Sequence, residues 1–113
     1  MRLALFGATG KAGGAILRES RAAGHDVCVL ARSPGALGQC DPHVTAIAGD
    51  VRDTAAAERA IDGADAVVSA VGGTQPGNLA VLQQGTSSIL AAMRRYDVHR
   101  LIVIQRLPPA LPR

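Results

Sequence analysis

Short apolar runs alternate with longer segments of mixed polarity along the chain. Each apolar run has five or six residues and few polar side chains, which is typical of strands that are covered on both faces. Strands are predicted over Arg2–Phe6, Asp26–Ala31, Val44–Ala48, 66–70 and 100–104. Because helical segments separate these runs, the pattern predicts βαβ units on a parallel sheet.

The first helix is predicted over residues 10–23. Gly24 follows it and is suited to a left-handed C-terminal cap. The apolar side chains expected to face the sheet are Ala12, Ala15, Ile16 and Ala22.

Two further helices are predicted. One covers Thr54–Ile61, with Asp53 as its N-cap and Gly63 after its end. The other covers residues 78–96 and is opened by Asn78 or the glycine before it. It carries an apolar stripe at helical spacing, made of Leu79, Leu82, Thr86, Ile89, Leu90 and Met93. This stripe is interpreted as core packing, with a partner helix in a dimer as the alternative.

Glycine and proline mark the irregular segments. Residues 33–43 contain two of each and are predicted to form a loop. Residues 105–113 contain three prolines, which exclude a continuing helix. The sequence has no internal repeat, and its length suits one domain. We expect a single domain over residues 1–104, followed by an irregular proline-rich tail over residues 105–113.

A glycine-rich turn, Gly7-Ala8-Thr9-Gly10-Lys11-Ala12-Gly13, links the first strand to the first helix. Gly7 permits a tight exit from the strand, Gly10 leaves room for a pyrophosphate, and Gly13 lets the helix approach the sheet. Backbone N–H groups at a helix N-terminus also attract anions. The turn therefore indicates a dinucleotide site, with a purely structural turn as the alternative. The predicted fold class is α/β, a Rossmann-type parallel sheet in the order 3-2-1-4-5 with helices on both faces.

Two polar residues of this turn are candidates for phosphate contact. Lys11 lies in the first helical turn, where the helix dipole opposes a cation unless an anion is near. A bound phosphate would supply that anion, although a solvated surface lysine is equally consistent with the sequence. Thr9 can offer its hydroxyl and its backbone N–H to the same phosphates.

The end of the second strand distinguishes the two nicotinamide cofactors. An acidic residue at this point binds the ribose 2′-hydroxyl of NAD, whereas arginine accommodates the 2′-phosphate of NADP. Arg32 stands here, followed by Ser33. This pair favours NADP(H) over NAD(H), and the alternative is an ordinary surface arginine.

Several ordered motifs extend beyond the glycine turn. They are LALFGATGKAG, VCVLARSP, AGDVRD, GADAVVSAVGG and SSILAAMRRYDVHRLIVI. With these motifs, residues 3–104 resemble the atypical short-chain dehydrogenases/reductases, in particular the NAD(P)H-binding, NmrA-like proteins related to biliverdin-IX-beta and flavin reductases.

The resemblance implies roles by position. Phosphate contacts fall on Gly7, Thr9, Gly10, Lys11 and Ala12, within the turn that also holds Ala8 and Gly13. The 2′-phosphate falls to Arg32 and Ser33, and the adenine to Asp50 and Val51. The ribose and nicotinamide lie beside Ala70, Val71 and Gly72.

The resemblance is incomplete at the C-terminal end. In the resembled reductases a segment with serine or threonine follows the fifth strand, and a substrate-binding portion comes after it. This chain has Gln105-Arg106-Leu107 and then prolines, so it looks C-terminally truncated and no catalytic residue is assigned. The Tyr-x-x-x-Lys pair of standard short-chain dehydrogenases is also not met, because Arg100 stands four residues after Tyr96 and cannot titrate like lysine.

Two functions remain open. The first is NADP(H)-dependent hydride transfer to a small flavin-, tetrapyrrole- or carbonyl-type acceptor. The second is NADP(H) binding without turnover, in a sensor or in a remnant that lacks the substrate region. In the predicted strand order the last strand lies at an edge, so we expect a homodimer through that strand or through the 78–96 helix.

Composition argues against several other classes of function. Phe6 and Tyr96 are the only aromatic residues, which argues against stacking on single-stranded nucleic acid. The net charge of +3 comes mainly from scattered arginines, interpreted as a solvated surface with local phosphate contacts as the alternative. Cys28 and Cys40 suggest neither a metal site nor a disulfide. No apolar run approaches the roughly 18 residues of a membrane span, and we expect a cytoplasmic protein.

Overall fold

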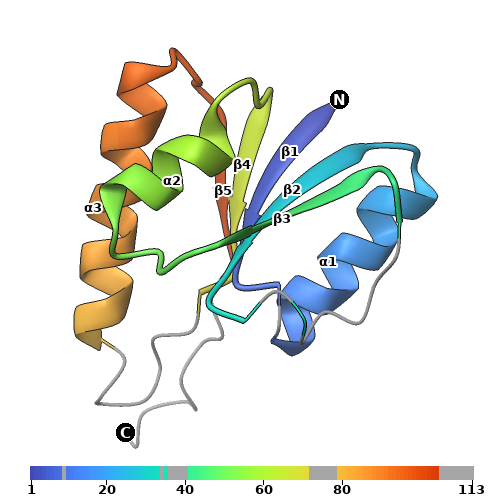
Figure 1. Cartoon of the computed structure of the whole chain (residues 1–113), viewed down its shortest axis with the longest axis horizontal. Helices are drawn as coiled ribbons and strands as arrows, with labels where there is room; N and C mark the ends of the chain where they lie inside the picture. Colours follow the sequence, from blue (N-terminus) through green and yellow to red (C-terminus); the bar gives the residue numbers. More distant parts are fainter. Residues whose placement is uncertain (9, 34, 36–40, 72–78, 105–113) are drawn as a thin grey trace, which may run out of the picture.

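The computed structural model describes residues 1–8, 10–33, 35, 41–71 and 79–104. Its strands form one parallel sheet in the order β3-β2-β1-β4-β5, which confirms the predicted topology (Figure 1). The strands are β1 (Arg2–Phe6), β2 (Asp26–Ala31), β3 (Val44–Ala48), β4 (Ala66–Ser69) and β5 (Leu101–Val103). The first three match their predicted bounds, and the last two are shorter than predicted.

The register brings the carboxyl ends of β1, β2 and β4 together at one end of the sheet. Phe6, the last residue of β1, pairs with Leu30 of β2 on one side and with Ser69 of β4 on the other. The chain order reverses at β1, since β2 and β3 lie on one side of it and β4 and β5 on the other. Ligands of open α/β sheets bind at such a switch point, outside the carboxyl ends of the strands.

Helices cover both faces of the sheet, as predicted (Figure 1). Helix α1 (Lys11–Ala22) lies on one face, and α2 (Thr54–Ile61) and α3 (Leu79–Arg95) lie on the other. Because strand side chains alternate, successive β1 residues enter different cores. Leu5 packs with Leu17 beneath α1, and Phe6 packs with Ile61 and Ile89 beneath α2 and α3.

The predicted sheet-facing side of α1 is confirmed only at Ile16, which packs against the core that contains Leu5 and Leu17. Ala12 and Ala22 are exposed, Ala15 and Ile16 are half-buried, and the fully buried positions are Gly13 and Leu17. The physical reason is that Gly13 lies directly against the carbonyl of Gly7, which turns residues 13 and 17 toward the sheet. The predicted helix end is confirmed, because Gly24 has a φ of 87°.

The prediction for α2 is confirmed, since Asp53 is its N-cap and accepts a hydrogen bond from the Ala55 backbone N–H at 3.0 Å. In α3, Ile89 and Met93 are buried as predicted, whereas Leu90 is 37% exposed. Ser88 and Ala92 are buried instead, so the buried side of α3 is rotated toward them. The proposed helix start at Asn78 and the side chain of Leu79 lie outside the described residues.

Two of the strands are not covered on both faces as predicted. In β3, Thr45, Ala46 and Ala48 are exposed, and in β5 Ile102 is 55% exposed. Both strands lie at edges of the sheet, where the flanking helices do not reach both faces. Most of the predicted 33–43 loop and the whole 105–113 tail lie outside the described residues. In the described segments we find no helix with the length and apolarity that crossing a membrane requires.

Candidate functional site

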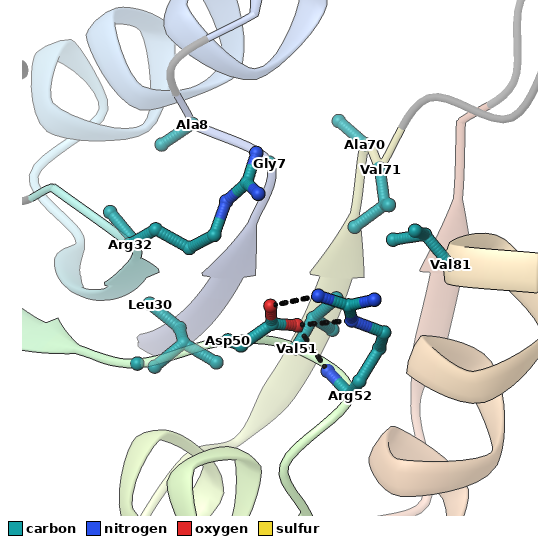
Figure 2. Close-up of a pocket in the computed structure, with 12 residues that line it drawn as sticks. Gly7, Ala8, Leu30, Arg32, Asp50, Val51, Arg52, Ala70, Val71 and Val81 are labelled. Atoms are coloured by element: carbon teal, nitrogen blue, oxygen red, sulfur yellow. Dashed lines mark hydrogen bonds and ion pairs between the residues drawn. The ribbon is translucent and has the colours of Figure 1, made fainter. Parts of the chain in front are cut away.

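A cleft of about 310 Å³ opens at the carboxyl ends of the strands, on the switch point of the sheet (Figure 2). Four chain segments meet there, following β1, β2, β3 and β4, and α3 closes one side. The lining residues are Gly7, Ala8, Leu30, Ala31, Arg32, Gly49, Asp50, Val51, Arg52, Ala70, Val71 and Val81. Clefts that bind small ligands are typically about 300 Å³ or larger, so this one is large enough for part of a dinucleotide.

The glycine turn depends on backbone contacts that a side chain would prevent. Gly7 has a φ of 85°, and a Cβ added to it would lie 2.7 Å from the carbonyl carbon and oxygen of Ala70. A Cβ on Gly13 would lie 1.9 Å from the carbonyl oxygen of Gly7. A Cβ on Gly10 would meet the Gly7 oxygen at 3.7 Å, an ordinary contact, so Gly10 is not required for packing.

The N-terminus of α1 follows this turn. Gly10 is the N-cap residue and provides no side-chain cap, and the first turn of α1 contains no acidic residue. The first N–H groups of a helix lack intrahelical partners and carry the positive end of its dipole. The exposed Lys11 adds a full positive charge at the same end. This end of α1 therefore favours an anion.

Arg32 is the residue after β2 and lines the cleft. Figure 2 shows its side chain extending from the end of β2 across the cleft toward Gly7, with no interaction joining it to the other residues drawn. Ser33 follows it and is exposed, but it is not among the lining residues.

Asp50 and Arg52 form an ion pair on the opposite wall (Figure 2). Arg52 donates from Nη2 to Asp50 Oδ2 at 2.7 Å and from Nε to Oδ1 at 3.0 Å, and its backbone N–H donates to Oδ1 at 2.9 Å. The Arg52 side chain and then its N–H lower the pKa of Asp50 to about 2. Asp50 is therefore ionised at neutral pH, and both of its oxygens accept hydrogen bonds from Arg52.

Helix α3 holds the segment that carries this pair. The buried Ser88 hydroxyl donates to the backbone carbonyl of Arg52 at 3.0 Å and accepts from the Thr54 hydroxyl at 3.3 Å. Gly85 lies against Val51, and a Cβ on this glycine would be 2.9 Å from Val51 Cγ1. The wall of the cleft that follows β3 is thus fixed from the neighbouring helix.

The predicted site residues divide into three groups. The cleft brings together Gly7, Ala8, Arg32, Asp50, Val51, Ala70 and Val71. Residues that are described but do not line it are Gly10, Lys11, Ala12, Gly13 and Ser33. Thr9 and Gly72 lie outside the described residues.

Five lining residues were not predicted from the sequence: Leu30, Ala31, Gly49, Arg52 and Val81. Arg52 is the most consequential of these because it is charged. Its signal in the sequence is an arginine two positions after an aspartate, Asp50, that is itself separated from the end of β3 by one glycine. The other four are apolar or glycine and are indistinguishable by type from core residues.

Other polar groups lie away from this cleft. A second cavity, of about 220 Å³, lies at the amino ends of β1 and β2, where His43 Nδ1 is 2.8 Å from Asp26 Oδ1. Cys28 lines that cavity and is buried, which raises the pKa of its thiol. Tyr96 and Arg100 are not among the residues of either cavity. Within the described ranges no three His, Cys, Asp or Glu side chains gather in a way that could hold a metal ion.

Comparison with known proteins gives a family match over most of the chain. A family model described as NAD(P)H-binding matches residues 7–108. A Rossmann-fold NAD(P)-binding family protein from Shigella flexneri is 26% identical, with a TM-score of 0.74 over 88% of this chain and 49% of its own. A protein from Burkholderia pseudomallei is 35% identical, with a TM-score of 0.72 over 91% of this chain and 47% of its own.

A third solved structure shares the fold. It is a mutant uronate dehydrogenase from Agrobacterium tumefaciens in complex with NAD, with a TM-score of 0.74 at 21% identity, covering 90% of this chain and 39% of that protein. The chain thus spans half or less of the length of each of these solved proteins.

Proposed function

Because the chain belongs to the NAD(P)H-binding family, we propose that its cleft binds NADP(H) as part of an oxidoreductase of the NmrA-like and flavin-reductase-like group. The observation that carries this proposal is the convergence of Arg32 with the glycine turn at the switch point of the sheet. A positive side chain and a closely approachable backbone turn meet in one cleft, which suits a ligand with separate phosphate groups.

Each part of the dinucleotide has candidate partners in this proposal. The pyrophosphate lies against the glycine turn and the N-terminus of α1, with Gly7, Ala8, Thr9, Gly10, Lys11, Ala12 and Gly13. The adenine lies beside Asp50 and Val51, and the 2′-phosphate beside Arg32 and Ser33. The ribose and nicotinamide follow the end of β4, past Ala70, Val71 and Gly72.

The proposed preference for NADP(H) rests on charge. No acidic residue follows β2, where NAD-binding Rossmann proteins place a carboxylate for the ribose 2′-hydroxyl, and Arg32 stands there instead. The NAD complex of the uronate dehydrogenase is evidence for a dinucleotide site in this fold and does not favour either cofactor for this chain. Our proposal of NADP(H) therefore depends on Arg32.

A bound NADPH supplies the hydride, and the residues of the chain bind and orient it. Val71 and Val81 make the side of the cleft next to β4 apolar. We propose a flavin-, tetrapyrrole- or carbonyl-type molecule as acceptor. We also propose that two copies associate through β5 or α3.

Replacing Arg32 tests the proposed cofactor. Arg32→Ala should weaken NADPH binding by roughly 1–3 kcal/mol, the scale of a charge-assisted contact, and leave NADH binding nearly unchanged. Nicotinamide fluorescence during titration of the purified chain measures both affinities. The matched control is Arg94→Ala, which removes an exposed arginine from the last turn of α3 and should change neither.

The same samples test turnover. Flavin added to the NADPH complex should oxidise the cofactor, with loss of its absorbance. Equal affinity of the unaltered chain for NADPH and NADH would contradict the role of Arg32. Tight binding without oxidation by flavin, tetrapyrrole or carbonyl acceptors would contradict the oxidoreductase function and support a sensor.

A further inference from the structure

The cleft contains one carboxylate between two arginines. Arg32 follows β2, and Asp50 and Arg52 follow β3. Together they give the cleft one net positive charge. Arg32 and Arg52 both lower the pKa of Asp50 through their charge, so all three groups share one electrostatic environment.

The Asp50 carboxylate is paired with one of the two arginines, Arg52. Arg52 occupies both Asp50 oxygens in a bidentate pair, at 2.7 and 3.0 Å, and Figure 2 shows this pair turned along the wall of the cleft, with Arg32 on the other side. The backbone reinforces the arrangement, because the Asp53 N–H donates to the Asp50 carbonyl at 2.9 Å and Ser88 holds the Arg52 carbonyl. A bidentate arginine pair has one fixed geometry, so Asp50 cannot make the same pair with Arg32 at the same time.

We propose that Arg52 is a positioning residue for cofactor selectivity: it retains the Asp50 carboxylate, so that Arg32 stays available for the 2′-phosphate of NADP(H). This inference rests on the proposed function. Without Arg52, the Asp50 carboxylate would be the nearest anion to Arg32 in the cleft and would compete with the phosphate. The carboxylate would also repel that phosphate, because no cation would neutralise it.

The test compares two variants and their combination. Arg52→Met removes the charge and keeps a long stem, and Asp50→Asn removes the competing carboxylate. Dissociation constants for NADPH and NADH are measured by calorimetry, together with adenosine 2′,5′-bisphosphate and AMP, which probe the adenosine part alone. Two ratios are compared, NADPH against NADH and adenosine 2′,5′-bisphosphate against AMP. Each ratio of dissociation constants gives the contribution of the 2′-phosphate to binding, because effects common to both ligands cancel.

Arg52→Met should lower the preference for the 2′-phosphorylated ligand about tenfold, the factor that roughly 1.4 kcal/mol produces at 25 °C. The double variant Asp50→Asn/Arg52→Met should recover the preference of the unaltered chain to within about threefold, since no carboxylate is left to pair with Arg32. The matched control is Arg95→Met, which breaks an exposed ion pair with Glu58 outside the cleft and should leave the ratio unchanged.

Two outcomes would overturn the inference while leaving the proposed function intact. An unchanged ratio in Arg52→Met would mean that Arg52 has no part in selectivity. A lowered ratio that the double variant does not recover would mean that Arg52 touches the phosphate itself. Failure of the unaltered chain to bind either dinucleotide would instead refute the proposed function, and this inference with it.

Discussion

Asp50 lines the candidate site and also contributes to the stability of the fold. The Arg52 side chain and then its backbone N–H lower the pKa of this carboxyl from 3.8 to about 2. A carboxyl whose pKa is lower in the folded state than in the unfolded state stabilises the fold when it is ionised in both. This contribution is therefore complete above the ordinary pKa and is lost as the pH falls from about 4 to about 2.

Removing Arg52 should reduce this acid sensitivity. In Arg52→Met the pKa of Asp50 should rise toward its ordinary value, and the free energy of unfolding should fall less between pH 4 and pH 2 than in the unaltered chain. Urea unfolding at several pH values measures the difference, and carbon NMR of the Asp50 carboxyl gives its pKa. Asp41, whose pKa is lowered mainly by Arg21, contributes equally in both proteins. An unchanged Asp50 pKa in the variant would contradict this account of the pair.

The individual side chains of the site were only partly predictable from the sequence. Arg32 could be placed because its position at the end of a strand follows from the strand itself. The pairing of Asp50 with Arg52 could not, because an arginine two residues away can extend to solvent or fold back onto the carboxylate. The conformation of Arg52 depends on the turn at Asp50–Asp53 and on Ser88, which lies in a helix that is distant in sequence but adjacent in space.

Between elements, the contact of α1 with the glycine turn is the tightest constraint near the cleft. Gly13 lies against the backbone of Gly7, whereas its neighbour Gly14 has ordinary space around it. A Cβ on Gly14 would lie 3.6 Å from the Ala8 carbonyl oxygen. The same substitution at these two adjacent glycines should therefore have different effects on stability, and each serves as a control for the other.

Gly13→Ala should destabilise the fold by roughly 3 kcal/mol, because the added methyl group would overlap backbone atoms that belong to the turn. Gly14→Ala should stabilise it by about 0.5–1 kcal/mol, since alanine is favoured over glycine inside a helix. Urea denaturation of both variants checks these signs. Similar stabilities for the two variants would contradict the close approach at Gly13.

The elements themselves followed closely from local signals. Asp53 predicted the start of α2, and Gly24 and Gly63, which have positive φ values, predicted the ends of α1 and α2. The buried face of α1 was not predictable, because it depends on how closely Gly13 approaches the turn. The exposure of β3 was also missed, since an apolar run does not indicate whether a strand lies at the centre or the edge of a sheet.

At the scale of the whole molecule, β5 leaves apolar side chains in contact with solvent. Ile102 is 55% exposed, and Val103 and the following Ile104 are 48% and 37% exposed. An apolar strand at a sheet edge favours pairing with another chain. Self-association through this edge is consistent with the exposure and remains a prediction.

Two substitutions distinguish the possible faces of a dimer. Ile102→Lys should convert a dimer formed through β5 into a monomer, whereas Leu90→Lys should do so only if α3 forms the contact. Sedimentation of each variant across micromolar concentrations measures the change. A stable monomer of the unaltered chain over the same range would refute both faces.

Backbone amide NMR during NADPH titration tests most directly whether NADP(H) occupies the cleft at the carboxyl ends of the strands. Binding in the cleft should give saturable shifts at Gly7, Ala8, Arg32, Asp50 and Val71, which line it. No shifts are expected at Arg2, Asp26 or His43, which line the cavity at the opposite end of the sheet. Shifts confined to that opposite end, or no shifts at saturating NADPH, would contradict binding in this cleft.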